Sequence, residues 1–277
     1  MTPGVLRVAV GQAVAHSGDV AANAARAAAL VEQAAAGGAR VLVLPELFLP
    51  GYDLPALALD TAADLVDADD PRLSPVLEAC RHTGTVALVS ASMPAAAGRT
   101  ISIVVVDGGG RATRAYDKQH VFGDEAEVFM QGGHGAALEL DGWRLGLGVC
   151  YDGCFPEHAR AAADAGAWAY LVPAAYVLGS EHRRDLYYAA RALDNGMYVA
   201  MAGLVGPCGA AGFGGGSAIY DPQGRRIAGV ADGEEGLAVA DLDPATVAAT
   251  RSAQTMGSDR LPDLGPVQLV PVSRSAM

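Results

Sequence analysis

The segment Val41–Leu44, which ends at Pro45 and Glu46, constrains the fold of this chain more than any other. Four consecutive apolar residues, two of them β-branched, are typical of a strand that is covered on both faces. Upstream, Leu6–Val10 has the length of a strand, and Asp19 is a plausible N-cap for a helix that runs to about residue 36. The first 46 residues therefore predict a strand, a helix and a buried strand, which indicates an α/β protein.

Hairpins are mixed with strand–helix–strand units in the rest of the chain. We expect helices over 75–82, from Pro156 onward and after Ser180, where Leu186, Ala189, Ala190 and Leu193 share one face. Residues 50–70 are expected to form a loop, and the chain from about residue 250 an irregular tail. The expected strands cover 86–90, 101–106, 112–116, 138–140, 145–149, 168–172, 198–202, 218–220, 227–230 and 237–242. Because no linker or repeat divides residues 1–277, we expect a single domain with mixed rather than purely parallel sheets.

Composition and charge exclude several classes of protein. With 51% hydrophobic and 18% charged residues, the chain is too apolar to be disordered, and its net charge of −12 disfavours nucleic-acid binding. No uninterrupted apolar stretch of about 18 residues is present, and residues 1–4 do not resemble a signal peptide. Four cysteines are too few for a disulfide scaffold, so we expect a cytoplasmic protein with free thiols and no membrane partner.

Cys150 lies where a buried strand ends, just before the helix that starts near Pro156. A nucleophile at a strand-to-helix corner is exposed by the sharp turn and lies near backbone N–H groups that can bind an oxyanion. The alternative is a packed free cysteine, because cysteine is among the most buried residues. A thiol with an ordinary pKa of about 8.5 also needs a base or a cation nearby. Glu46 and Lys118 each end a strand and provide candidates, although each taken singly is more typical of a solvated charge.

The three segments together resemble the nitrilase superfamily of carbon–nitrogen hydrolases. The resemblance is carried by a strand followed by Pro45-Glu46, by the motif from Tyr116 to Phe122 that contains Lys118, and by Cys150-Tyr151-Asp152 followed by Phe155-Pro156-Glu157. It implies a four-layer α-β-β-α sandwich of two mixed sheets. It further implies that Glu46 is the general base, that Cys150 is the nucleophile, and that Lys118 and the N–H of Tyr151 stabilise the oxyanion. It implies no metal and no organic cofactor.

A second glutamate near the lysine is common in that superfamily and lies seven residues before a glycine. Glu125 has this spacing to Gly132, and Glu127 is the alternative. The resemblance assigns Glu125 to positioning the substrate amide and holding Lys118 or Cys150. A loop carboxylate without a role is the other interpretation.

Departures from the superfamily pattern bear on the substrate. Where N-carbamoyl amino-acid hydrolases have an arginine that helps hold the substrate carboxylate, this chain has Cys154, which cannot replace a guanidinium. A substrate carboxylate near that helix start is therefore disfavoured. Cys150-Tyr151-Asp152 resembles the amidase and carbamoylase branches more than true nitrilases. The aromatic faces of Tyr52 and Tyr176 are candidates for substrate contacts, and equally for core or subunit contacts.

The leading hypothesis is hydrolysis of a small carboxamide to an acid and ammonia. The alternatives are an N-carbamoyl amine hydrolase of the ureidopropionase or carbamoylputrescine amidase type, then a nitrilase, then a catalytically silent small-molecule-binding protein. A redox or metal role for Cys150 and Cys154 is disfavoured, because disulfide oxidoreductases separate their cysteines by two residues. The resemblance also implies a homodimer or a higher homo-oligomer that pairs through the helices after Cys150 and near residue 185.

Overall fold

Two six-stranded mixed sheets form the centre of the molecule. The computed structural model describes residues 3–59, 67–261 and 263–271. The first sheet has the order β14-β1-β2-β3-β4-β5. Its strands are β1 (Leu6–Gln12), β2 (Val41–Val43), β3 (Val86–Ala95), β4 (Gly98–Val106), β5 (Ala112–Asp117) and β14 (Gly236–Leu242). β1, β2 and β3 are parallel, whereas β4, β5 and β14 are antiparallel to their neighbours, so the predicted mixture is confirmed.

The second sheet repeats this arrangement with a parallel centre and antiparallel edges. Its order is β13-β12-β9-β8-β7-β6, in which β7, β8 and β9 are parallel. The strands are β6 (Ala136–Leu140), β7 (Trp143–Leu147), β8 (Ala169–Ala174), β9 (Tyr198–Gly203), β12 (Ala218–Tyr220) and β13 (Arg226–Gly229). A separate hairpin of β10 (Val205–Cys208) and β11 (Ala211–Gly214) was not predicted, because its glycines indicated turns.

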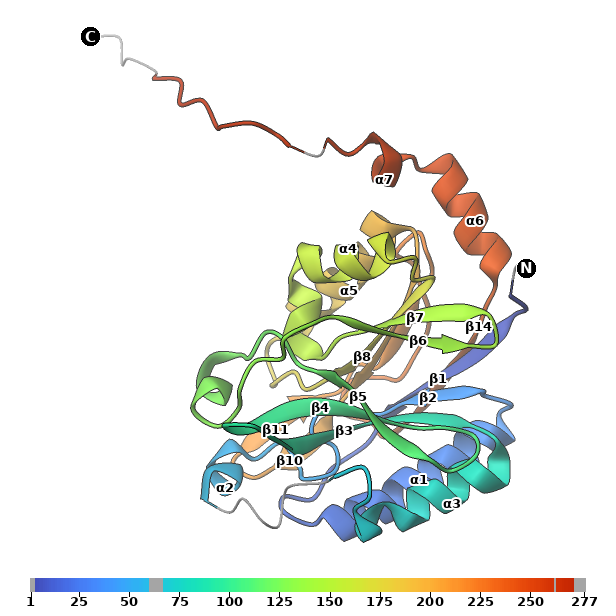
Figure 1. Ribbon diagram of the computed structural model, residues 1–277, viewed down its shortest axis with the longest axis vertical. Helices are drawn as coiled ribbons and strands as arrows, with labels where there is room; N and C mark the ends of the chain where they lie inside the picture. Colours follow the sequence, from blue (N-terminus) through green and yellow to red (C-terminus); the bar gives the residue numbers. More distant parts are fainter. Residues whose placement is uncertain (1–2, 60–66, 262, 272–277) are drawn as a thin grey trace.

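The two sheets pack face to face, and a pair of helices covers each outer face (Figure 1). α1 (Val20–Ala36) and α3 (Ser74–Thr83) cover the first sheet, and α4 (Pro156–Asp164) and α5 (Glu181–Asn195) cover the second. This is the expected four-layer α-β-β-α sandwich. Asp19 caps α1 as predicted, since its carboxylate accepts from the backbone N–H of Ala22.

The central strands are buried on both faces, as the Val41–Leu44 run predicts. Val41 and Val43 contact the core between the sheets, whereas Leu42 and Leu44 contact the layer under α1 and α3. Successive strand residues point to opposite faces, so one strand contributes side chains both to the core between the sheets and to the core under the helices.

Three expectations for individual elements were wrong. The segment predicted as a loop contains α2 (Leu54–Leu59) and a 3₁₀ turn (Pro71–Leu73), and its residues 60–66 lie outside the described part. Ser180 precedes α5 but does not cap it with its side chain, because its hydroxyl donates to the carbonyl of Val177. The tail is not wholly irregular from residue 250, since α6 (Pro244–Ala253) and the single-turn α7 (Met256–Asp259) occupy part of it.

The predicted apolar face of α5 points away from the body of the protein. Leu186 is 68% exposed and Leu193 is 41% exposed, whereas Arg184, Tyr188 and Arg191 are buried. The guanidinium groups lie inside because backbone carbonyls accept from them: Gly215 O from Arg184 and Gly153 O from Arg191. A buried arginine is tolerated where such acceptors compensate its charge. No helix in the described residues combines the length and the apolar character that a membrane crossing requires.

Candidate active site

The three predicted residues meet at one end of the two sheets. Glu46 follows β2, Lys118 follows β5 and Cys150 follows β7, so both sheets contribute. The backbone N–H of Glu46 donates to the carbonyl of Ala174 at the end of β8, which links the sheets at this end (3.4 Å). The Lys118 ammonium lies 2.7 Å from Glu46 Oε1, and neither side chain is accessible to solvent.

Glu125 completes the cluster from a 3₁₀ turn (Gly123–Glu127) after the lysine segment. Its two carboxylate oxygens lie 2.8 and 2.6 Å from the Lys118 ammonium, and it also accepts from the Phe122 N–H and the Tyr52 hydroxyl. Glu125 is 1% exposed, whereas the alternative, Glu127, is exposed. Glu125, the glutamate with the expected spacing to Gly132, is therefore the one that reaches Lys118.

Cys150 has a backbone conformation that few residues adopt. Its φ is +44°, in the left-handed region, where the Cβ atom of an L-residue is crowded. The Tyr188 hydroxyl donates to the Cys150 carbonyl (3.1 Å), and the thiol contacts the Ala175 carbonyl (3.8 Å). Gly153 lets Tyr188 approach, because a Cβ there would lie 2.6 Å from the tyrosine ring. The surrounding contacts thus hold the strained turn that aims the thiol.

The cluster controls which groups carry a proton. Burial, and after it the charge of Glu125, raise the pKa of Glu46 to about 7 against the attraction of Lys118. Burial raises the pKa of the Cys150 thiol well above its ordinary value, and the charge of Glu46 adds to this. Burial would lower the pKa of Lys118, but the two carboxylates outweigh it and raise the pKa. The resting site therefore holds an ammonium and a neutral thiol beside a carboxylate that can accept a proton.

Asp152 ties the lysine segment to the cysteine turn. It is fully buried, and it accepts from the Tyr116 hydroxyl (2.7 Å) and from both the N–H and Nδ1 of His120 (2.9 and 2.8 Å). Tyr116 and His120 flank Lys118 at a distance of two residues. Asp152 also accepts from the N–H of Val149, just before Cys150 (2.9 Å). One carboxylate thus fixes the position of Lys118 relative to Cys150.

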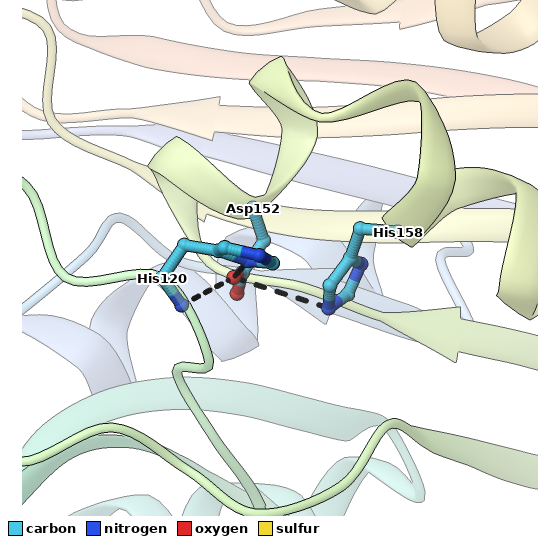
Figure 2. Close-up of side chains that lie close together, drawn as sticks. All are labelled: His120, Asp152 and His158. Atoms are coloured by element: carbon cyan, nitrogen blue, oxygen red, sulfur yellow. Dashed lines mark hydrogen bonds and ion pairs between the residues drawn. The ribbon is translucent and has the colours of Figure 1, made fainter.

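His120, Asp152 and His158 form a cluster that resembles a set of metal ligands (Figure 2). Each group already has hydrogen-bond partners: Nε2 of His158 meets the Tyr116 hydroxyl, and its Nδ1 meets the Tyr170 hydroxyl (2.9 and 2.8 Å). Burial lowers the pKa of His158, which favours the neutral ring in this network. The arrangement fits a hydrogen-bonded support better than a metal centre. Neither His158 nor its hydrogen bonds to Tyr116 and Tyr170 were predicted from the sequence.

A cavity of about 110 Å³ opens beside Cys150. Tyr52, Cys154 and Tyr176, the three expected substrate contacts, line it together with Tyr151. The hydroxyl of Tyr52 is bound to Glu125, and that of Tyr176 lies 3.5 Å from the Cys154 sulfur. Other residues that line the cavity were not predicted from the sequence, among them Phe122, Arg183 and Tyr187. Only the position of Phe122 in the lysine motif hinted at its role.

Comparisons with known proteins decide the family. The model of the family described as carbon-nitrogen hydrolase matches residues 7–252. The chain belongs to this family. A curated hydrolase, "Hydrolase in pqqF 5'region" of Pseudomonas protegens, is 35% identical over 94% of this chain and 90% of its own. The deaminated glutathione amidase of Escherichia coli O157:H7 is 32% identical over 83% of this chain and 88% of its own.

A solved structure supports the same assignment for this carbon–nitrogen hydrolase. The amidase from Nesterenkonia sp. AN1, solved as a double mutant in complex with acrylamide, has a TM-score of 0.81 and 29% identity. The match covers 92% of this chain and 94% of that one. That amidase is from the nitrilase superfamily, so the resemblance derived from the three sequence segments is confirmed.

Proposed function

We propose that this carbon–nitrogen hydrolase converts a small carboxamide to a carboxylic acid and ammonia through a thioester on Cys150. The observation that carries the proposal is the buried cluster of Glu46, Lys118 and Glu125 beside a cysteine that opens into a small cavity. At about 110 Å³, the cavity is small compared with the roughly 300–1,000 Å³ of pockets that hold drug-sized ligands. An amide group and a few methylenes fill such a space.

The first half of the reaction forms the acyl-enzyme. The Cys150 sulfur attacks the amide carbon while its proton passes to Glu46, whose Oε2 has no hydrogen-bond partner that meets ordinary geometry among the described residues. The Lys118 ammonium and the N–H of Tyr151 stabilise the oxyanion. One such donor is worth about 3–4 kcal/mol of barrier. The C–N bond then breaks, Glu46 returns the proton to the leaving nitrogen, and ammonia departs.

The second half releases the acid. Glu46 removes a proton from a water molecule that attacks the thioester carbon, and the C–S bond breaks as the thiolate regains the proton. Glu125 keeps Lys118 in place and, with Tyr52, faces the side on which the substrate nitrogen enters. The amidase from Nesterenkonia sp. AN1, which has also been solved in complex with butyramide, supports a small carboxamide as the substrate class.

Ammonia release across a panel of substrates tests this function. The panel contains simple carboxamides such as butyramide, ω-amino amides, N-carbamoyl amines and nitriles, and Cys150→Ala is the control. We expect carboxamides to give the highest kcat/KM and the control to have no turnover. If N-carbamoyl compounds or nitriles are preferred, the substrate class is wrong. If Cys150→Ala matches the wild type, the nucleophile is wrong.

We also propose that the enzyme is at least a homodimer that pairs through α4 and α5. The exposed leucines of α5, at positions 186 and 193, support this pairing because a helix that presents apolar side chains to solvent is typical of a subunit contact. The exposed small side chain of Ala161 on α4 allows close approach of a second copy.

A further inference from the structure

The backbone N–H of Tyr151 donates to no acceptor in the described part of the chain. Tyr151 follows Cys150 directly and lines the reactive cavity. Backbone N–H groups of folded proteins are nearly all paired, either with other protein groups or with water. An N–H that is left over at the edge of a reactive cavity is available to the oxygen atom of a substrate.

The carbonyl of Cys150 belongs to the same peptide unit as this N–H. None of the described peptide bonds is cis, and the C=O and the N–H of a trans peptide point in opposite directions. The Tyr188 hydroxyl of α5 donates to this carbonyl (3.1 Å). Tyr188 therefore fixes one side of the peptide plane, and the N–H of Tyr151 has to point away from it.

This peptide unit needs such a support because of the backbone conformation of Cys150. Its φ of +44° lies in the left-handed region, and a residue other than glycine stays there only where its surroundings hold it. Tyr188 is fully buried, so its hydroxyl has no water to bond instead of the carbonyl. Its place in the packing makes the bond to Cys150 a fixed part of the turn.

A chain of hydrogen bonds leads from Tyr188 back to the wall of the reactive cavity. The Tyr176 hydroxyl donates to the Tyr188 hydroxyl (3.3 Å), and the Cys154 sulfur lies 3.5 Å from the Tyr176 oxygen. A carbonyl only accepts, so Tyr188 gives its one proton to Cys150 and accepts from Tyr176. Tyr176 then has no proton left for Cys154. The Cys154 thiol is thus the donor at the start of the chain.

Burial keeps the donors of this chain protonated. It raises the pKa of Tyr188, of Tyr176 and of the Cys154 thiol above their ordinary values. Hydrogen bonds in a chain polarise one another and so strengthen each other. The last bond polarises the C=O of Cys150, and amide resonance passes this polarisation to the N–H of Tyr151. The chain therefore both orients this N–H and makes it a better donor.

We propose that Tyr188 is a positioning residue that aims the N–H of Tyr151 at the oxyanion of the reaction, and that Tyr176 and Cys154 support it from the cavity wall. This inference rests on the proposed thioester mechanism. The substrate oxygen becomes negative only when the Cys150 sulfur bonds to the substrate carbon. The hydroxyl of Tyr188 should therefore matter for the formation of the oxyanion and not for the binding of the substrate.

The experiment compares reactions that form an oxyanion with one that does not. We expect Tyr188→Phe to lower kcat for butyramide about ten- to a hundredfold, with KM changed by less than about threefold. The inhibition constant of butanal should rise by a similar factor, because its carbonyl oxygen becomes the oxyanion when the Cys150 sulfur bonds to its carbonyl carbon.

Methyl methanethiosulfonate provides the reaction without an oxyanion. The Cys150 sulfur attacks the methylthio sulfur of this reagent, a disulfide forms and methanesulfinate leaves. Its rate of inactivation should be the same with and without the Tyr188 hydroxyl. Both proteins carry Cys154→Ser in this measurement, so that Cys150 is the thiol that lines the cavity.

Tyr198→Phe is the matched control. Its hydroxyl is also buried and also bonds to the backbone, at the N–H and the carbonyl of Asp243 (3.1 and 3.4 Å), but it lies at the start of β9, outside the active site. It should lower the free energy of unfolding in urea as Tyr188→Phe does, but leave kcat as it is. Cys154→Ser keeps a donor and should retain more of the wild-type kcat than Cys154→Ala.

The outcomes separate this inference from the proposed function. If Tyr188→Phe slows the thiosulfonate reaction as much as hydrolysis, Tyr188 holds only the thiol, and the inference is overturned while amide hydrolysis stands. An unchanged kcat overturns it as well. A wild type that prefers N-carbamoyl amines overturns the proposed substrate class, but that reaction forms the same oxyanion, and Tyr188→Phe should slow it equally. If turnover is too slow to measure, equal inhibition of wild type and Tyr188→Phe by butanal overturns the inference.

Discussion

The surroundings of Glu46 determine the pKa of its carboxyl group. A buried carboxylate is costly in free energy, and Lys118 alone would hold it ionised. The second carboxylate, Glu125, shares the same ammonium and so weakens that attraction. The result is a pKa of about 7 instead of the ordinary 4.5. A base with a pKa near the working pH can both take and return a proton, as the two halves of the proposed reaction require.

The pH profile of kcat/KM should therefore show a decline on its acidic side with a midpoint near pH 7. As the pH falls through the pKa of Glu46, the carboxylate takes up a proton and can no longer accept one from Cys150. We expect kcat/KM for butyramide to fall about tenfold for each pH unit below this point. Glu46→Gln should abolish turnover while the protein remains folded by circular dichroism. A flat profile between pH 5 and 8 would remove Glu46 from the role of base.

Glu125 should act through the charge it places beside Glu46. The negative charge of Glu125 is one of the causes that raise the pKa of Glu46, so Glu125→Gln should move the acidic limb to lower pH. It should also lower kcat about tenfold or more, because Lys118 loses a charged partner. Glu127→Gln, two residues along and exposed, is the matched control. Equal profiles for both variants would contradict the role given to Glu125.

At the scale of elements, the site depends on three turns that follow strands of two different sheets. Asp152 joins two of them, because its oxygens accept from groups on both sides of Lys118 and from the N–H before Cys150. Gly148 has a related role, since a Cβ there would lie 1.9 Å from the Tyr170 hydroxyl that binds His158. The catalytic distances are therefore properties of the packing between the sheets rather than of any one loop.

Replacing Asp152 should affect stability and activity together. In Asp152→Asn, an amide N–H₂ group replaces one of the carboxylate oxygens that accept from the Tyr116 hydroxyl and from His120. At least one of these buried donors then has no acceptor and no water to replace it. We expect the free energy of unfolding in urea to fall by about 3 kcal/mol. We also expect kcat to fall while the KM changes less, because the turn of Cys150 loosens. Asp69→Asn, at an exposed carboxylate, should change neither quantity.

The sequence predicted elements best where local patterns dominate. The two-sided burial of the run Val41–Leu44, the cap at Asp19 and the turn after β7 all follow from neighbouring residues. The sequence failed where tertiary contacts decide, as in α5, whose arginines point inward to reach the carbonyls of Gly153 and Gly215. Residues such as Arg183 and Tyr187 could not be assigned to the cavity, because only the packing of α5 on the second sheet brings them there.

At the scale of the whole molecule, the apolar side chains that the body does not cover include Leu186 and Leu193 on α5 and several along the C-terminal segment. That segment leaves the sandwich after α7 (Figure 1), and its described part includes Leu264, Val267 and Leu269, each at least 85% exposed. An isolated chain would present all of this surface to water, at a cost of about 25 cal/mol for each Å². A second copy that covers α5 removes part of that cost.

Light scattering tests this pairing directly. At micromolar concentration we expect a mass of at least twice that of the chain, because in the proposed dimer Leu186 and Leu193 of two α5 helices are buried against each other. Leu186→Glu places a charge in that contact and should shift the mass toward the monomer. Leu59→Glu introduces the same charge at a 90% exposed position on α2, which lies on the side of the first sheet and not with α4 and α5 on the second, and should leave the mass unchanged (Figure 1). A wild-type mass equal to that of one chain, or an equal change of mass in the two variants, would show that α5 is not the subunit contact.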